Sequence, residues 1–357
     1  MNIVTQWYNR YVSDPQVVIL AVLLTVGFLV MLLLGKMLAP VLAGVVIAYL
    51  LDGVVEKLHK LGMPRTPAVV LVFLMFMAFV IFAALWLAPR LSAQITQLVR
   101  QLPDIITLVQ GVMQQLPERY PKLFTAEQVS ELGVSIRAEI TLLSQRILSL
   151  SVPAVTGLVT LLVYIILVPV LSFFFMKDKQ RIFAWLSQRL PPQRHLVDAV
   201  ASDVNLQVAN YVRGKVWEIF IVGAAAYATF KLMGLDYALL LSTMVGLSVV
   251  IPYIGAAVVT VPVAVIAWFQ WGWSPDFGWV LFAYAVLQAL DGNLLAPLLF
   301  SEVVNLHPVA IIVAILVFGG IWGFWGVFFA IPLATLVQAV MTAWPRMHKN
   351  DEAAAAG

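Results

Sequence analysis

The stretch Asp291-Gly292-Asn293-Leu294-Leu295-Ala296-Pro297-Leu298-Leu299-Phe300 lies between two long apolar runs, Leu281 to Leu290 and Pro308 to Ala343. An Asp at the centre of a membrane-spanning helix costs at least ~2.5–3.5 kcal/mol on insertion scales. Gly292 and Pro297 disfavour a continuous helix, and a helix break at membrane depth persists only where protein or a watery cavity satisfies the freed backbone groups. Two interpretations follow. Either Asp291 belongs to a transport site built on a broken helix, or it caps a helix end at the membrane interface.

The composition indicates a protein with many membrane spans. The chain is 62% hydrophobic and 11% charged, against about 45–50% and about 25% in soluble domains. Its 357 residues leave room for about eight spans of ~20 residues. We therefore predict an all-α fold: a polytopic helical membrane protein with about eight transmembrane helices, some broken or re-entrant, plus amphipathic helices outside the membrane. The lipid bilayer is the expected partner, and the net charge of only +3 suggests no nucleic acid.

Alternation of apolar and polar segments predicts six parts of the chain. They are N-terminal transmembrane helices (1–88), an external amphipathic helical segment (89–151), a transmembrane helix (152–176), a basic cytoplasmic amphipathic segment (177–215), a C-terminal transmembrane bundle with broken helices (216–344) and a cytoplasmic tail (345–357). Within the first part, Val17 to Leu51 is expected to form a tight hairpin, and a polar loop follows from Asp52 to Pro67. The third span is expected to end at Pro89, because proline disrupts a helix interior.

Two polar segments carry apolar residues at helical spacing, which is typical of amphipathic helices rather than spans. The stripes of the first segment, Arg90 to Ser151, suit packing against each other, against a neighbouring subunit or against the bilayer surface. The alternative is an ordinary helical hairpin outside the membrane. The stripes are Leu91, Ile95, Leu98, Val99 and Leu102; Val129, Leu132, Ile136, Ile140, Leu143 and Ile147; and Leu196, Val200, Val204, Val208 and Tyr211.

Lys and Arg in the loops predict the orientation, because cytoplasmic loops carry an excess of these residues. One consistent arrangement places on the cytoplasmic side Arg10, the loop with Lys57, Lys60 and Arg65, the segment from Lys177 to Lys215, and Arg346 with Lys349. The turn-rich loop from Trp271 to Trp279 has no Lys or Arg and then lies outside. Both termini are expected in the cytoplasm.

Enzyme signatures are missing from the sequence. It has no Gly-rich phosphate loop and no Gly-x-Ser-x-Gly elbow, and its four histidines do not have the spacing of a zinc site. The absence of cysteine excludes disulfides, thiolate metal sites and a cysteine nucleophile. We predict a protein that is not an enzyme and has no metal site and no cofactor.

Polar residues near the two expected helix breaks are the candidates for a transport pathway. Asp291 would bind a cation or proton, and Asn293 would either orient Asp291 by a hydrogen bond or cap a helix. His307 near a carboxylate such as Glu302 could relay protons, unless these residues are solvated in a short interfacial loop. Tyr253 lies in a segment that is either unwound to bind solute or a tight turn.

Prolines and glycines mark the candidate helix breaks and hinges. The glycine cluster in the last apolar block suits close helix packing at least as well as gating. Glu218, just inside the fifth expected span, either faces a cavity or pairs with Arg213 or Lys215. The hinge candidates are Pro252, Gly255, Gly292, Pro297, Pro308, Gly319, Gly320 and Gly323.

Four ordered motifs carry a resemblance to a known family. They are Phe173-Phe174-Phe175-Met176-Lys177-Asp178, the run from Gly234 to Leu241, Val250-Ile251-Pro252-Tyr253-Ile254-Gly255, and the run from Leu287 through Asp291-Gly292-Asn293 to Leu306-His307-Pro308. The chain resembles the autoinducer-2 exporter-like family, also called PerM-type permeases. The resemblance implies a bacterial inner-membrane protein that assembles as a homo-oligomer.

The resemblance also implies transport, without fixing the solute. The first hypothesis is a secondary transporter that exports a small polar solute such as autoinducer-2. The alternatives are a sodium(lithium)/proton antiporter, a passive channel and an oligomeric membrane scaffold without transport. The expected partners are therefore a small polar solute or a monovalent cation or proton, and further copies of the chain.

Overall fold

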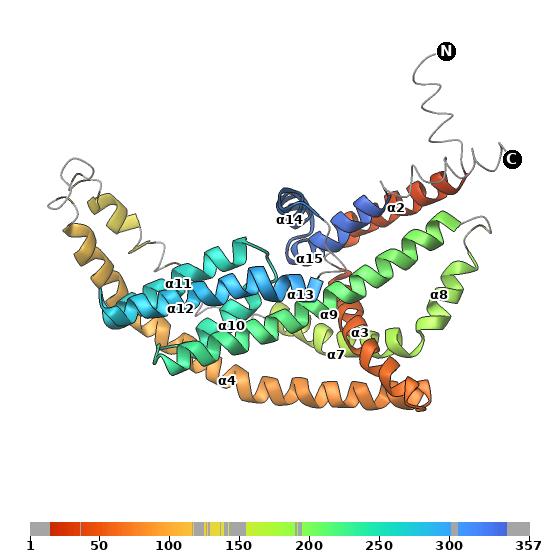
Figure 1. The fold of residues 1–357 in the computed structure, drawn as a ribbon, viewed down its shortest axis with the longest axis horizontal. Helices are drawn as coiled ribbons and strands as arrows, with labels where there is room; N and C mark the ends of the chain where they lie inside the picture. The colour runs from red at the N-terminus through yellow and green to blue at the C-terminus, as the bar shows by residue number, and fades with distance from the viewer. Residues whose placement is uncertain are drawn as a thin grey trace, which may run out of the picture.

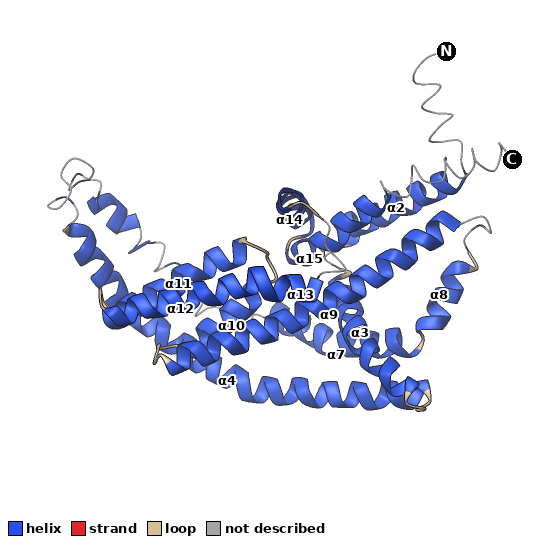
Figure 2. Cartoon of the chain, in the orientation of Figure 1, coloured by secondary structure: helices blue, strands red, loops and turns tan. Residues whose placement is uncertain are grey.

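The structure, a computed structural model, describes residues 15–35, 37–115, 155–189, 195–300 and 306–340, with residue 191 and short pieces between 117 and 142. All elements in this part of the chain are helices, and it contains no strand (Figure 2). The predicted all-α class is therefore confirmed. The stripe residues Ile136, Ile140, Leu143 and Ile147 lie outside the described residues, as do the segments 1–14 and 341–357.

Three helices share a core in the N-terminal half. These are α3 (Ala39–Lys60), α4 (Arg65–Gln114) and α7 (Val155–Lys177), which bury Val55, Val69 and Met176 between them. The polar loop predicted from Asp52 onward is instead largely helical, since α3 continues to Lys60. Asp52 can lie on this helix because Arg65 and Lys179 pair with its carboxylate at 3.3 and 2.8 Å.

The first described helix, α2 (Pro15–Leu34), packs on α9 (His195–Leu232) rather than on α3 as the predicted tight hairpin would require. Val17 and Leu20 are buried there against Leu196 and Val200. The predicted interruption between the two helices, near Gly35 and Pro40, is present. The helices are adjacent in the chain but diverge after it (Figure 1).

The long helix α4 differs most from expectation, because it continues through Pro89 and Pro103 to Gln114. A proline removes a single i→i−4 hydrogen bond, and packing on both sides of Pro89 holds the helix together. Figure 1 shows α4 bending partway along its length. Its distal half lies against α10 (Ala238–Ser248), where the Gln94 side chain accepts a hydrogen bond from the Leu240 amide at 2.8 Å.

The predicted basic segment divides between two helices. The short helix α8 (Lys179–Ser187) follows α7 directly, and α9 begins after Pro191-Pro192. Helix α9 extends beyond the predicted basic segment, because it runs without a break from this segment into the expected fifth span. Its predicted apolar stripe is buried or partly buried, with Leu196, Val200 and Tyr211 below 9% exposure.

A C-terminal bundle holds the largest core. It contains α9, α10, α11 (Ile254–Trp271) and α12 (Pro275–Leu290), with Phe230, Leu241, Val263 and Tyr284 among the buried residues. The chain continues from α12 through the π-helical turn η1 (Asp291–Leu295) into α13 (Ala296–Phe300). Gly223 of α9 and Gly246 of α10 let these two helices approach with backbones in contact.

The last apolar block is a broken helix that folds back on itself. α14 (Pro308–Trp322) ends at Gly323, whose φ is +60°, and α15 (Phe324–Phe328) packs back on it. A Cβ at Gly319 would meet the Val327 side chain at 2.7 Å, and one at Gly326 would overlap the Phe318 carbonyl. These glycines therefore serve close packing. A further apolar helix follows from Ala330 to Val340.

The described residues include five helices that are long and apolar enough to cross a membrane, and shorter apolar helices accompany them. The five spans lie in α2, α3, α4, α11 and the continuous run from α12 to α13. Large apolar side chains cover the outside of the protomer, including Leu33, Leu85, Phe282 and Leu316, as expected for surfaces that face lipid. The polytopic membrane class is confirmed.

Candidate transport site

A cavity of about 500 Å³ lies where α9, the α10–α11 turn, the α12–η1–α13 run and α14 meet. Its wall is mostly apolar, with a few polar groups that converge on it, which is the usual composition of a small-molecule site. The lining residues are Lys215, Glu218, Val249, Ile251, Pro252, Tyr253, Ala256, Gln288, Asp291, Gly292, Ala296, Pro297, Phe300, Leu306, Ile311 and Ile331.

One wall carries a buried ion pair on α9. The Lys215 Nζ lies 2.5 Å from the Glu218 Oε2, and the two side chains are 3% and 5% exposed. Lys215 also donates to the Val249 carbonyl at 2.9 Å and lies over the Phe300 ring, 5.0 Å from its centroid. Removing either charge would leave the other buried and uncompensated, so both residues of the pair are needed together.

A second wall presents Asp291 at the start of the π-helical turn. The Ala296 amide bonds to the Asp291 carbonyl, five residues back instead of four, so the predicted helix break is instead a local widening of a continuous helix. Pro297 has no amide proton to donate to Asn293 four residues earlier, which favours such a turn. The Asp291 Oδ1 is buried and has no hydrogen-bond partner among the described residues.

The turn between α10 and α11 forms the third wall. Tyr253 there has φ +63°, a left-handed conformation that costs a residue with a side chain about 1–3 kcal/mol. Gly255 packs so tightly that a Cβ would overlap the Ser248 carbonyl. The segment is thus a tight, strained turn rather than an unwound strand of free carbonyls, and it places Pro252 and Tyr253 at the cavity.

The structure brings together only some of the predicted pathway residues. Asp291 and Tyr253 line the cavity, but Asn293 does not: its amide donates to the Ala289 carbonyl at 2.9 Å on the exposed side of the helix. His307 also lies away from the lining and caps α14, accepting from the Val309 amide at 3.2 Å, with Pro308 in the first turn. Glu302 lies outside the described residues.

Some of the hinge candidates line the cavity, and others lie elsewhere. Pro252, Gly292 and Pro297 line the cavity, whereas Gly255 and Gly319 are sites of close packing. Gly323 has the positive φ that ends α14. A Cβ at Gly320 would meet no atom within 4 Å, so no contact requires a glycine there.

Lys215 and Gln288 were not among the predicted site residues. The sequence offered a signal for the first, because Lys215 and Glu218 are one helical turn apart at the start of an apolar run. Gln288 precedes Asp291 by three residues, and its amide donates to the Tyr284 hydroxyl at 2.6 Å. Among the described residues no group of three or more His, Asp or Glu side chains is placed to hold a metal ion.

The charges that face the cavity define its chemistry. Two carboxylates, Glu218 and Asp291, stand against one ammonium group, and the ammonium is already paired with Glu218. A carboxylate only accepts hydrogen bonds when ionised, so the free Asp291 oxygen suits a hydroxyl or a cationic donor. An anionic solute would meet repulsion from it.

Known transport proteins are similar to this chain over nearly its whole length. Residues 18–346 match the model of a family described as "AI-2E family transporter". The chain is 42% identical to PerM of Escherichia coli (strain K12), a permease by name, over 346 residues that cover 97% of this chain and 98% of that protein. YueF of Bacillus subtilis (strain 168), a transport protein by name, is 29% identical over 308 residues, 84% of this chain and 82% of YueF.

Proposed function

We propose that this chain, which belongs to the AI-2E family of transporters, exports a small, hydroxyl-rich solute such as autoinducer-2 through the cavity beside Asp291. As a member of this family it is a multi-pass permease of the bacterial inner membrane and not an enzyme. The family match does not name the solute of this chain. The proposal therefore rests on what the cavity is built to accept.

The single observation that carries the proposal is the buried Asp291 oxygen without a partner, which lies in a cavity of about 500 Å³. A cavity of this size suits a small molecule. Hydroxyl groups would donate to Asp291 and to Glu218, while the Lys215 ammonium and the Gln288 amide supply donors for the solute's own oxygens. A sugar-like signal has both kinds of group. An excess of carboxylate over ammonium disfavours an anionic solute.

The test is transport into sealed inside-out membrane vesicles, with autoinducer-2 as the probe. We expect Asp291→Asn to lower the initial rate about tenfold, because a charge-assisted hydrogen bond exceeds a neutral one by about 1.4 kcal/mol. Asp276→Asn is the matched control, since Asp276 lies in the first turn of α12, the helix that leads into Asp291, and does not line the cavity. Both variants should reach wild-type abundance in the membrane.

A wild-type rate in the Asp291 variant would remove this residue from the pathway. If wild-type vesicles move no autoinducer-2 although the protein is folded, the proposed solute is wrong. The same vesicles test coupling: flux that ignores an imposed sodium or proton gradient indicates a passive channel. No specific observation on the chain favours sodium(lithium)/proton antiport over solute export.

A further inference from the structure

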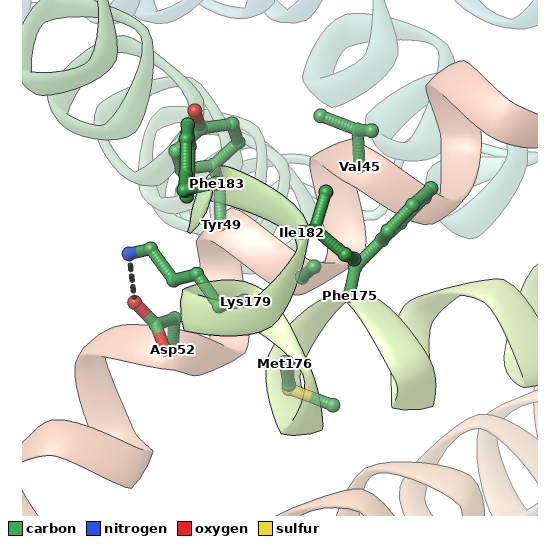
Figure 3. A pocket seen from close by; sticks show the side chains of 9 residues that line it. Val45, Tyr49, Asp52, Phe175, Met176, Lys179, Ile182 and Phe183 are labelled. Carbon is green, nitrogen blue, oxygen red and sulfur yellow. Dashed lines mark hydrogen bonds and ion pairs between the residues drawn. The ribbon is translucent and has the colours of Figure 1, made fainter. Parts of the chain in front are cut away.

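A second cavity, of about 190 Å³, lies at the joint between α7 and α8, far along the chain from the transport site. α7 ends at Lys177 and α8 starts at Lys179, with Asp178 at the bend. Figure 3 shows Val45 and Tyr49 of α3 on one side of this cavity, facing Phe175, Ile182 and Phe183 from the joint.

The walls of this joint cavity are mostly apolar, and the two charged residues that line it, Asp52 and Lys179, are paired with each other. Lys179 pairs with Asp52 at 2.8 Å (Figure 3), and Arg65 reaches the second oxygen of the same carboxylate at 3.3 Å. An apolar cavity of ~150 Å³ in another protein stays dry and takes up apolar molecules. The joint cavity therefore suits a hydrocarbon group.

Helix α8 extends this apolar surface to the outside. None of its residues is buried, and Phe183, Trp185 and Leu186 are 53%, 56% and 51% exposed. These residues share one side of the helix with Ile182. A short helix with an exposed aromatic and aliphatic side, placed directly after the apolar helix α7, is typical of a segment that lies in the interface of the bilayer.

The charges around the joint point to an anionic partner. Residues 177–189 contain the basic residues Lys177, Lys179, Arg181 and Arg189 against the single acid Asp178. Arg181 is 88% exposed and only 3.6 Å from Asp178 in a weak surface pair, and Lys177 is exposed. Arg189 lies over the Trp185 ring at 3.9 Å. Basic residues at the end of a span attract anionic lipid headgroups.

We propose that the α7–α8 joint binds one anionic phospholipid, with part of an acyl chain in the joint cavity and the phosphate beside Lys177 and Arg181. The site holds a membrane lipid, not a transported solute. It does not depend on the solute proposed above, because no residue of the joint cavity lines the larger cavity.

Native mass spectrometry of the full-length protein in mild detergent tests this site. Dioleoyl phosphatidylglycerol and dioleoyl phosphatidylcholine are titrated separately, since they share their chains and differ in headgroup charge. We expect one retained phosphatidylglycerol per protomer and weaker retention of phosphatidylcholine. The preference should fall about fivefold for each basic residue removed in Lys177→Gln and Arg181→Gln, and about twenty-fold or more in the double variant.

Two cavity variants test the acyl part of the site. Val45→Phe fills the space and Phe183→Ala removes one wall, so both should reduce retention of both lipids. The controls lie on α3 away from the cavity: Val54→Phe, at an apolar position 48% exposed, and Lys60→Gln, whose side chain is 74% exposed. Neither control should change retention.

Three outcomes would overturn the proposal. The first is an unchanged preference for phosphatidylglycerol in the double charge variant. The second is unchanged retention in both cavity variants while they elute as folded protein in size-exclusion chromatography. The third is displacement of the bound species by millimolar inorganic phosphate, which would indicate a free anion rather than a lipid.

Discussion

Lys215 is a buried cation in the wall of the transport cavity. Its ammonium contacts the Glu218 carboxylate at 2.5 Å and the Val249 carbonyl at 2.9 Å, and it is 3% exposed. A buried pair of this kind adds little net stability, yet breaking it by removing one partner typically costs about 3–5 kcal/mol. Substitutions at this position therefore distinguish the loss of one charge, which leaves its partner unpaired, from the loss of the whole ion pair.

We expect Lys215→Met to lower the free energy of unfolding by about 3–5 kcal/mol, because Glu218 is left buried without its partner. The double variant Lys215→Met/Glu218→Met should recover most of this loss. Arg181→Met is the matched control, since Arg181 and Asp178 have the same i,i+3 spacing but the Arg181 side chain is 88% exposed, and its loss should change stability by less than about 1 kcal/mol. Thermal melting in detergent measures all three; equal destabilisation by the single and double variants would contradict the pairing argument.

The sequence predicted the kind of chemical groups in the site better than it predicted which individual residues line the cavity. Asp291 and Tyr253 line the cavity as expected. Asn293 was a candidate because it lies near Asp291 in the chain, but its side chain bonds to its own helix. His307 fills the cap position that precedes Pro308. Near a π-helical turn, the direction in which a side chain points depends on where the turn begins. The types of the residues alone do not predict that position.

Two glycines, Gly223 and Gly246, allow the close contact between α9 and α10. A Cβ at Gly246 would lie 2.9 Å from the Ile219 carbonyl oxygen and 3.0 Å from the Gly223 Cα. Both are backbone atoms, so they cannot move aside as a flexible side chain does. This pairing holds Lys215 and Glu218 on α9 in place beside the α10–α11 turn.

We expect Gly246→Ala to lower the free energy of unfolding by about 1–3 kcal/mol, because the two helices must separate to accept the methyl group. The matched control is Gly278→Ala in α12, where a Cβ would meet no atom within 4 Å. That substitution should stabilise the helix by about 0.5–1 kcal/mol. Thermal melting of the two variants should therefore shift in opposite directions, and a neutral Gly246 variant would show that the helices repack without penalty.

The existence of most helices could be predicted from apolar runs, but two helix ends could not. Pro89 was expected to end a span, yet α4 continues to Gln114 because its distal half packs on α10. Likewise Gly292 and Pro297 were expected to break a helix and instead lie in a π-helical turn and the helix that follows. Proline and glycine weaken a helix locally by a known amount, whereas tertiary packing decides whether that amount suffices to end it.

Two helices of the molecule, α4 and α9, are longer than a helix needs to be to cross the membrane. α4 has 50 residues and α9 has 38, or roughly 75 and 57 Å at 1.5 Å per residue, against a hydrocarbon core of about 30 Å. Both helices cross predicted boundaries, at residues 89 and 215, so these boundaries are not ends of helices. The distal part of α4 carries hydrogen bonds to the α9–α10 turn, where Tyr237 donates to the Gln101 side chain at 2.6 Å. Whether the six parts act as separate units stays a prediction, as does the homo-oligomer.

The orientation of the molecule is the last prediction, and the chain is suited to test it because it contains no cysteine. Leu61 follows the last basic turn of α3 and Trp273 lies in the turn between α11 and α12; they are 83% and 81% exposed. The excess of Lys and Arg near Leu61 favours a cytoplasmic position there. In intact spheroplasts a membrane-impermeant maleimide should label Trp273→Cys at once and Leu61→Cys only after permeabilisation. The reverse pattern would invert the molecule and place the basic joint of α7 and α8 outside, whereas labelling of both sites from outside would contradict an odd number of crossings between them.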